Sequence, residues 1–402
     1  MVVIKKEIFM FEKFGIEAEY MIVHKETLQV LPVAHLFFEK MHKQTNSASI
    51  DEINMGRVSL SNELANHVIE LKCTVPEKSL VGLDEVFHET VLKVNEELEE
   101  YDGVLMPTAM HPYMIPEKET MLWPYGQKEI YQAYDKIFGC KGHGWANLQS
   151  VHINLPFEDE EEFVCLYNAI RLILPLVPFL SASSPFYEGR EGETLNSRIA
   201  FYRNNQKRIP SVTGEVIPEE LTSFDDYENL LKRIYADLAV LDPEGVLQYP
   251  WINSRGAIAK MDVKAIEIRL MDIQESPLAD FVLIDFFVAV LKFLTRKKQV
   301  LSYSQKSLVE IFNSSLKSKD FHLPKDYTDV FDLEESSMND FIENLFEKKA
   351  QEFMSSEKYK GLMRDKIKSP SLGQKMKEDR LSNDLLKKLI DCLRENRLFH
   401  GK

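Results

Sequence analysis

Apolar and polar residues alternate strictly in four short segments within the first 290 residues. In FGIEAEYMIV, which starts at Phe14, apolar side chains hold the even positions, and Glu17 and Glu19 hold odd ones. The segments NHVIELKC, QSVHINLPF and AIEIRLMD, which start at residues 66, 149 and 265, show the same alternation. Because side chains two residues apart on a strand share a face, each segment predicts a strand with one apolar and one polar face.

The polar faces of these predicted strands are rich in carboxylates. Glu70 lies on the second strand, His152 and Asn154 on the third, and Glu267 and Arg269 on the fourth. An ordinary antiparallel sheet with one wet face also alternates, and for any single strand that interpretation is the better one. Four such faces together argue against it, because ordinary wet faces carry Lys, Thr and Ser as often as Glu. We therefore expect one shared polar face, with Ile16, Ile153 and Ile268 on the opposite face against helices.

Carboxylates that converge on one face need a positive partner. Like charges at close range raise each other's pKa and destabilise the folded protein unless cations are present. Hard divalent ions prefer oxygen ligands and tolerate one imidazole, so the pattern favours Mg²⁺ or Mn²⁺ over zinc. The acids expected to converge are Glu17, Glu19, Glu70 and Glu267, together with Glu63.

Basic residues are frequent between the third strand and the end of the fourth. Arg255 and Lys260 stand in RGAIAK, just before the Glu267 strand and among few acids. Basic groups beside a carboxylate–metal cluster indicate a bound polyphosphate, with the metal bridging carboxylate and phosphate oxygens. A Walker A loop, a G-x-S-x-G elbow and a dinucleotide fingerprint are all missing from the sequence, and GCKGHG at 139–144 reads as a turn.

The later part of the chain reads as helical. Phe281, Ile284, Val288 and Leu291 recur at helical spacing and predict a buried helix. Ser382 is a suitable cap for a last helix whose apolar positions include Leu385 and Leu389. The expected class is α+β: a catalytic domain at 1–300, with a helical region at 301–402 packed on it.

Composition excludes several classes of protein. The 402 residues are 44% apolar and 28% charged, with a net charge of −15, which argues against nucleic acid as a partner. The four cysteines lie far apart, so neither a disulfide framework nor a zinc ribbon is expected. We find no signal peptide. The apolar window at 163–182 contains Arg171 and two prolines, and the window at 281–294 contains Asp285 and Lys292, so we expect no membrane span and a cytoplasmic protein.

Ordered motifs over residues 12–295 resemble the glutamate–cysteine ligase type 2 family of carboxylate–amine ligases, relatives of glutamine synthetase. The motifs are the four strand segments, MPTAMHP, and LSASSPFYEGREGETLNSR before the Glu267 strand. The resemblance implies a glutamine-synthetase-like fold, in which a curved, mostly antiparallel sheet carries ATP and its metals on one face and helices cover the outer face. It places six residues at metal-ligand positions: Glu17, Glu19, Glu63, Glu70, His152 and Glu267.

The resemblance also implies roles for basic and polar residues. Arg269 matches a phosphate-contacting position, and Arg198 and Arg255 match positions for substrate or phosphate. We assign catalytic roles to Arg269 and Arg255, and substrate or phosphate binding to Arg198, Lys260 and Asn154.

The family's reaction joins glutamate to cysteine with ATP, through an acyl phosphate. This chain has Glu17-Ala18-Glu19 where many bacterial members have three acids, and Ser150-Val151-His152 where many have His-x-His. The amine substrate therefore stays open. The alternatives are a ligase for a different acid or amine, and a non-catalytic nucleotide-binding relative. The partners expected are small molecules, and a homodimer is plausible by analogy with relatives.

Overall fold

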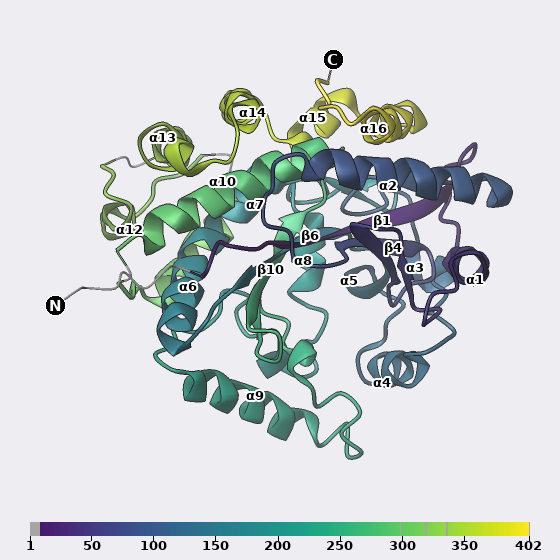
Figure 1. The fold of residues 1–402 in the computed structure, drawn as a ribbon, viewed down its shortest axis with the longest axis horizontal. Coiled ribbons are helices and arrows are strands. Elements are labelled where there is room, and N and C mark those ends of the chain that lie inside the picture. Colours follow the sequence, from purple (N-terminus) through teal and green to yellow (C-terminus); the bar gives the residue numbers. More distant parts are fainter. Residues whose placement is uncertain (1–8, 298, 318–319, 335–336, 402) are drawn as a thin grey trace.

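A computed structural model describes residues 9–297, 299–317, 320–334 and 337–401, and its centre is an eight-stranded sheet (Figure 1). The strands run in the order β2-β3-β4-β1-β6-β10-β9, with β5 also paired to β1, and all these pairings are antiparallel. Their bounds are β1 (Gly15–His24), β2 (Glu52–Asn54), β3 (Val58–Asn62), β4 (Val68–Cys73), β5 (Gly103–Met106), β6 (Ser150–Pro156), β9 (Ala257–Lys260) and β10 (Ala265–Asp272). A separate hairpin joins β7 (Phe186–Tyr187) and β8 (Arg190–Glu191). The four predicted strands are β4, β1, β6 and β10, which lie side by side.

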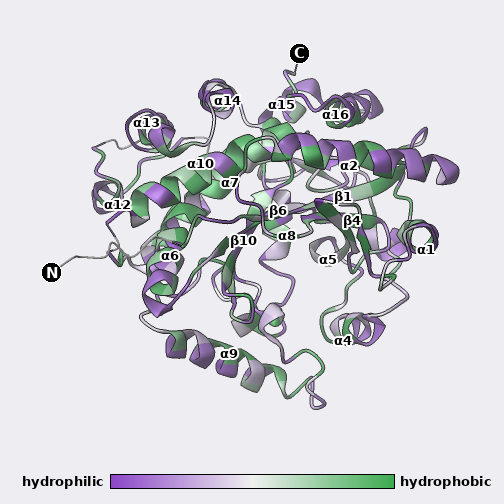
Figure 2. Ribbon diagram, viewed as in Figure 1, coloured by the Kyte–Doolittle hydropathy of each residue, from purple (hydrophilic) through white to green (hydrophobic). Residues whose placement is uncertain are grey.

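Helices cover the apolar face of this sheet. They are α2 (Leu83–Leu98), α6 (Glu160–Ile173), α7 (Val177–Ser181) and α10 (Pro277–Thr295). Ile16, Ile153 and Ile268 are at most 2% exposed and belong to the same core as Phe281 of α10. Helix α10 is hydrophobic along most of its length (Figure 2), and Ser276 caps its first turn by accepting a hydrogen bond from the backbone N–H of Ala279. The predicted α+β class, the antiparallel sheet and the helix at 281–294 are confirmed.

The segment Glu160–Ser181 bears on the expectation that the chain has no membrane span. By length and composition alone it could cross a membrane, although its charged residues and prolines led us to exclude this. In the fold, 94% of its most apolar window is buried inside the protein. The core helix of a globular protein can have the same composition. Burial in the core of this protein therefore explains why the segment is so apolar.

Most of the helices after residue 300 pack on the outside of the helical layer, and the last of them also contacts β5 of the sheet (Figure 1). They are α11 (Gln305–Lys317), α12 (Lys325–Val330), α13 (Met338–Leu345), α14 (Glu357–Lys368), α15 (Leu372–Asp379) and α16 (Asn383–Glu395). The predicted cap of the last helix is confirmed, because Ser382 accepts a hydrogen bond from the backbone N–H of Leu385. Leu385 and Leu389 are buried as expected. A domain boundary at residue 300 stays a prediction.

The remaining helices belong to the connections around the polar face and the rim of the sheet. They are α1 (Ala34–Thr45), α3 (Pro116–Glu119), α4 (Lys128–Phe138), α5 (His143–Ala146), α8 (Ser197–Tyr202) and α9 (Phe224–Leu238). Helices α4 and α9 lie on the opposite side of the sheet from α10 (Figure 1). The polar face is therefore bordered by α4 and α9, while the apolar face is closed by α10 and its neighbours.

Candidate active site

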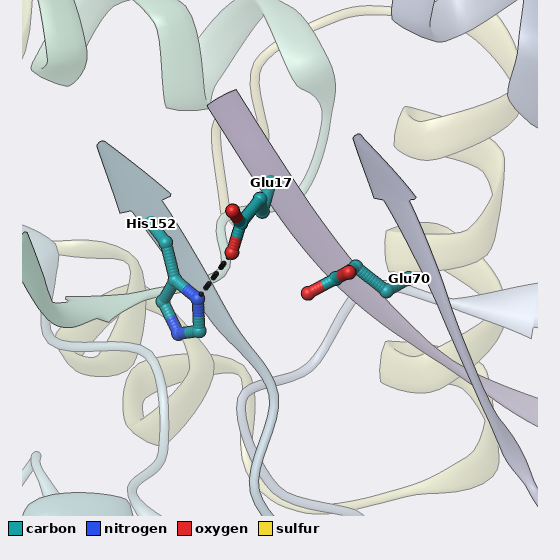
Figure 3. A group of neighbouring side chains, drawn as sticks. All are labelled: Glu17, Glu70 and His152. Carbon is teal, nitrogen blue, oxygen red and sulfur yellow. Dashed lines mark hydrogen bonds and ion pairs between the residues drawn. The ribbon is translucent and has the colours of Figure 1, made fainter. Parts of the chain in front are cut away.

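The centre of the polar face is an ion pair between neighbouring strands. Glu17 of β1 lies opposite His152 of β6 in the antiparallel register, and its Oε2 is 3.0 Å from Nδ1 of the imidazole (Figure 3). The side-chain amide of Asn154 donates to the other oxygen of Glu17 at 3.0 Å. Figure 3 shows the Glu70 carboxylate, from β4, pointing toward these two side chains. Alternation alone therefore brings three strands' polar side chains together.

Ser150 fixes a second carboxylate beside the same imidazole. Both its backbone N–H and its hydroxyl donate to Oε2 of Glu19, at 2.7 and 3.0 Å. Because the hydroxyl proton is used there, the Ser150 oxygen accepts from Nε2–H of His152 at 2.9 Å. Nδ1 faces the Glu17 carboxylate, which can only accept, so the ring donates there in the cation-free protein, and a ring nitrogen that ligates a cation must first lose its proton. Burial disfavours the charged ring, but the hydrogen bond to Glu17 and the nearby charges of Glu267 and Glu19 outweigh it and raise the pKa of His152.

Glu267 lies at the opposite edge of this group, with a side chain only 2% exposed. Its Oε1 is 3.8 Å from Nδ1 of His152, and Oε1 of Glu19 is 3.9 Å from Nε2 of the same ring. The predicted proximity of Glu19 and Glu267 is therefore met. Two cations also contact Glu267: Lys260 of β9, and Arg269, whose Nε donates at 2.9 Å.

The Lys260 and Arg269 charges lower the pKa values on this side of the site. Burial alone would raise the pKa of Glu267, but the charge of Arg269, with His152 and Lys260, holds it below its usual value. Burial likewise opposes ionisation of Glu17, and hydrogen bonding to His152 with the charges of His152 and Lys260 overcomes it, so the pKa of Glu17 is well below its usual range. Both carboxylates are therefore ionised.

The other side of the site has a deficit of positive charge. Among the residues that the structure describes, no lysine or arginine is within ion-pair distance of Glu19, Glu63 or Glu70. Ser61 donates to Oε1 of Glu70 at 2.7 Å. Burial, followed by the charge of Glu17, raises the pKa of Glu70 to about 7, and burial with the charges of Glu70 and Glu19 raises the pKa of Glu63 well above its usual value.

This donor set fits a divalent cation. Ligand atoms of Glu17, Glu70 and His152 lie within 4.8 Å of one another, as do those of Glu19, Glu63 and Glu70. Both groups use Glu70 and contain mostly carboxylate oxygens, the chemistry that Mg²⁺ and Mn²⁺ prefer. The raised pKa values of Glu63 and Glu70 show where a cation would replace protons.

We expect cation binding at pH 7 to release protons, because Glu70 is only partly ionised there without a cation. Titration calorimetry with Mg²⁺ in two buffers of different ionisation enthalpy measures the number released. The raised pKa also sets the direction in which stability changes with pH. The pKa of Glu70 rises from 4.5 to about 7 on folding, so this group lowers the free energy of unfolding of the cation-free protein as pH rises between those values. Binding enthalpies that are identical in the two buffers would contradict this expectation.

Arg255 and Arg198 are not part of this group. The Arg255 guanidinium donates through Nε and one terminal nitrogen to both oxygens of Glu219, at 2.6 and 2.7 Å, and through the other terminal nitrogen to the carbonyl of Ser211. Arg198 is bonded to Asp272 and to backbone carbonyls of β10. Both arginines are 2% exposed. The catalytic role expected for Arg255 and the binding role expected for Arg198 stay predictions, and the contacts made by both side chains are internal.

Sequence reasoning missed the serines that hold the carboxylates. Ser150 has the same strand parity as His152, so alternation already placed it on the polar face. Ser61 lies on β3, a strand that we did not predict because VSLSN is short and follows a polar loop. Tyr131 of α4 was also missed, and its hydroxyl accepts from the amide of Asn62 at 3.2 Å, next to Glu63.

Comparison with known proteins gives concordant results. The family model named "Glutamate-cysteine ligase family 2 (GCS2)" matches residues 13–310. An uncharacterised protein of Archaeoglobus fulgidus is 31% identical over 393 residues, which are 96% of this chain and 99% of that protein. A candidate glutamate–cysteine ligase 2 of Bradyrhizobium diazoefficiens is 22% identical over 223 residues, 55% of this chain and 47% of its own length.

A solved structure shows the same fold. The crystal structure of a glutamate–cysteine ligase from Francisella tularensis in complex with AMP superposes with a TM-score of 0.59 at 14% identity, over 97% of this chain and 90% of that chain. The predicted glutamine-synthetase-like fold is thereby confirmed. Since the family model spans all eight strands of the sheet and all the acids of its polar face, the chain belongs to glutamate–cysteine ligase family 2.

Proposed function

We propose that this protein is an ATP-dependent carboxylate–amine ligase that joins the γ-carboxylate of glutamate to the amine of cysteine, working in the cytoplasm with Mg²⁺ or Mn²⁺. The observation that carries the proposal is the polar face of the sheet, where five carboxylates, one imidazole and two cations meet above an apolar core. Family membership supports the ligase class, and the choice of glutamate and cysteine rests on the family resemblance alone.

In the proposed reaction, the γ-carboxylate of glutamate attacks the γ-phosphate of ATP, giving an acyl phosphate and ADP. The amine of cysteine then attacks the acyl carbon, forming the amide bond and releasing phosphate. A divalent cation held by Glu17, Glu19, Glu63, Glu70 or His152 would neutralise phosphate oxygens. Phosphoryl transfer needs positioning and charge neutralisation more than covalent chemistry from the protein.

Lys260 and Arg269 are the chain's own groups for this task. Their side chains are 34% and 18% exposed, so both reach solvent. Both form ion pairs with the Glu267 carboxylate, whose side chain is only 2% exposed. An arginine held in this way is preorganised, and it presents a planar fork that matches phosphate oxygens. Lys260 also lies 3.2 Å from Glu17, so it links the two ionised carboxylates.

Release of ADP tests the proposal directly. The purified protein is incubated with Mg²⁺, ATP, glutamate and each amino acid in turn, and products are identified by mass. We expect ADP and phosphate, with the largest rate for cysteine and a product equal to the two amino acids minus water. A higher rate with another amine or acid would change the proposed substrates and leave the proposed ligase activity in place. AMP and pyrophosphate would require adenylation instead, and ATP binding without turnover would favour a non-catalytic relative.

Replacing Arg269 by alanine is expected to lower kcat roughly 30- to 1,000-fold. This corresponds to a loss of about 2–4 kcal/mol of transition-state stabilisation. The KM for ATP should change less, because the arginine acts on charge that develops during transfer. Steady-state kinetics at saturating glutamate measure both constants. An unchanged kcat with a raised KM would assign Arg269 to ground-state binding.

A further inference from the structure

A buried ion pair lies behind the active-site strand β10. Arg198 of α8 and Asp272, the last residue of β10, are 2% and 0% exposed, and a terminal nitrogen of the arginine is 3.1 Å from Oδ1 of the acid. The other oxygen of Asp272 accepts from the backbone N–H of Ser183 at 3.1 Å and from the hydroxyl of Ser184 at 2.9 Å. The acid is thus fully bonded by its own neighbourhood and is not one of the cluster carboxylates.

The same guanidinium holds the backbone of β10 where that strand is irregular. The pairing of β10 with β6 shifts between Ile268 and Met271, which is a β-bulge. Arg198 donates to the carbonyl of Leu270 at 3.2 Å and to the carbonyl of Arg269 at 3.1 Å. A bulge interrupts the ladder and re-aims a side chain, and its carbonyls need other partners. Arg198 supplies them.

The other edge of the bulge is held just as closely. The backbone N–H of Arg269 donates to the carbonyl of Gly256 at 3.0 Å. A side chain on Gly256 would place its Cβ 2.6 Å from Leu270, so only glycine permits this approach. The peptide units around Arg269 are therefore fixed on both sides, by Arg198 and by Gly256.

We propose that Arg198 is a positioning residue that acts through Arg269. This inference rests on the proposed function, in which the Arg269 guanidinium stabilises the transferring phosphoryl group. Arg198 contacts no carboxylate of the cluster, and its effect on the reaction passes through the bulge backbone, which sets where the Arg269 side chain leaves β10. Its fork bonds two carbonyls and one carboxylate at once, a geometry that lysine cannot reproduce.

The test is Arg198→Lys, which keeps the buried positive charge beside Asp272 but loses the fork. We expect kcat to fall about 100-fold, with KM for ATP within a few-fold of wild type, because displacement of a catalytic group by about 1 Å costs this much. Arg171→Lys is the matched control. Arg171 is also fully buried and also donates to two backbone carbonyls, those of Pro218 and Tyr303, but it lies on α6. Its kcat should stay at the wild-type value.

A double-mutant cycle separates positioning from direct catalysis. If Arg198 acts through Arg269, the variant Arg198→Lys/Arg269→Ala should be no slower than Arg269→Ala alone, within about threefold. Losses that multiply would overturn the proposal and assign Arg198 an independent role. Where Arg198→Lys does not fold, Asp272→Asn takes its place in the cycle, since it removes the partner that orients the guanidinium.

Hydrogen exchange keeps this proposal distinct from the proposed function. In Arg198→Lys, backbone amides of residues 268–272 should exchange at least tenfold faster than in wild type, while those of 151–155 on β6 are unchanged. This readout needs no substrate. If the wild-type protein shows no ligase turnover, the proposed function is wrong. The exchange rates would still show whether Arg198 holds the bulge. Unchanged exchange at 268–272 would overturn the positioning role in either case.

Discussion

Glu267→Gln is expected to lower kcat by about 1,000-fold, at the upper end of what one preorganised electrostatic group contributes. The substitution keeps the shape of the side chain and removes its charge. Lys260 and Arg269 then lose the buried anion that anchors both of them, and they repel each other across the site. The cluster also loses one candidate cation ligand. Initial rates with saturating ATP and glutamate measure the effect.

Glu162→Gln is the matched control for this substitution. Glu162 of α6 is also buried, at 4% exposure, but the hydrogen bonds that its two oxygens accept within the described part of the chain come from the backbone N–H groups of Phe9 and Glu158. Both variants should unfold cooperatively, and only Glu267→Gln should lose activity. A wild-type kcat in a folded Glu267→Gln variant would show that Glu267 has no catalytic role, and that its contacts with Lys260 and Arg269 are not needed for the reaction.

Dialysis against EDTA is expected to abolish product formation completely, and Mg²⁺ or Mn²⁺ should restore it. The reason is the charge deficit at Glu63 and Glu70, which retain protons when no cation is present. Mg²⁺ should also raise Tm in the absence of substrates, because a ligand that binds only the folded state stabilises it. The two readouts are independent of each other.

Neutral variants locate the cation. Glu63→Gln and Glu70→Gln should raise the Mg²⁺ concentration needed for half-maximal activity at least tenfold and reduce the shift in Tm, whereas Glu162→Gln should change neither. Full turnover in excess EDTA after extensive dialysis would end the metal hypothesis, whatever the variants do.

The sheet and its polar face could be predicted from the sequence because strand parity is a local property. Alternation at Glu17, Glu19, His152 and Glu267 assigns each side chain to a face, and carboxylates that share a face with imidazole, Lys260 and Arg269 can be compensated there. The strand order itself does not follow from parity. The family resemblance implied one curved, mostly antiparallel sheet, and the order of its strands is known only from the structure.

The arginines show where this reasoning ends. Arg255 precedes β9 and Arg198 lies on the short helix α8, so no periodicity says which way either points. Each pairs with an acid that sequence periodicity does not place: Arg255 with the half-buried Glu219 in a loop, and Arg198 with the buried Asp272 at a strand end. The bulge between Ile268 and Met271 was invisible as well, because an extra residue changes pairing and leaves composition unchanged.

The site is assembled from strands far apart in the chain, and this has a consequence for synthesis. Glu17 on the central strand β1 meets Glu267 only after 250 further residues have been added. At about 5–20 residues per second, the ribosome needs roughly 12–50 s for that length. Strand β6 is made about halfway through this interval and β10 only at its end, so a chain that stops short of β10 has the candidate cation ligands but lacks Glu267 and Arg269. Such long-range pairing makes folding slow. The ligands for Mg²⁺ are therefore made well before the Arg269 side of the site, and the newly made chain becomes able to stabilise a transferring phosphoryl group only once its last sheet strand is in place.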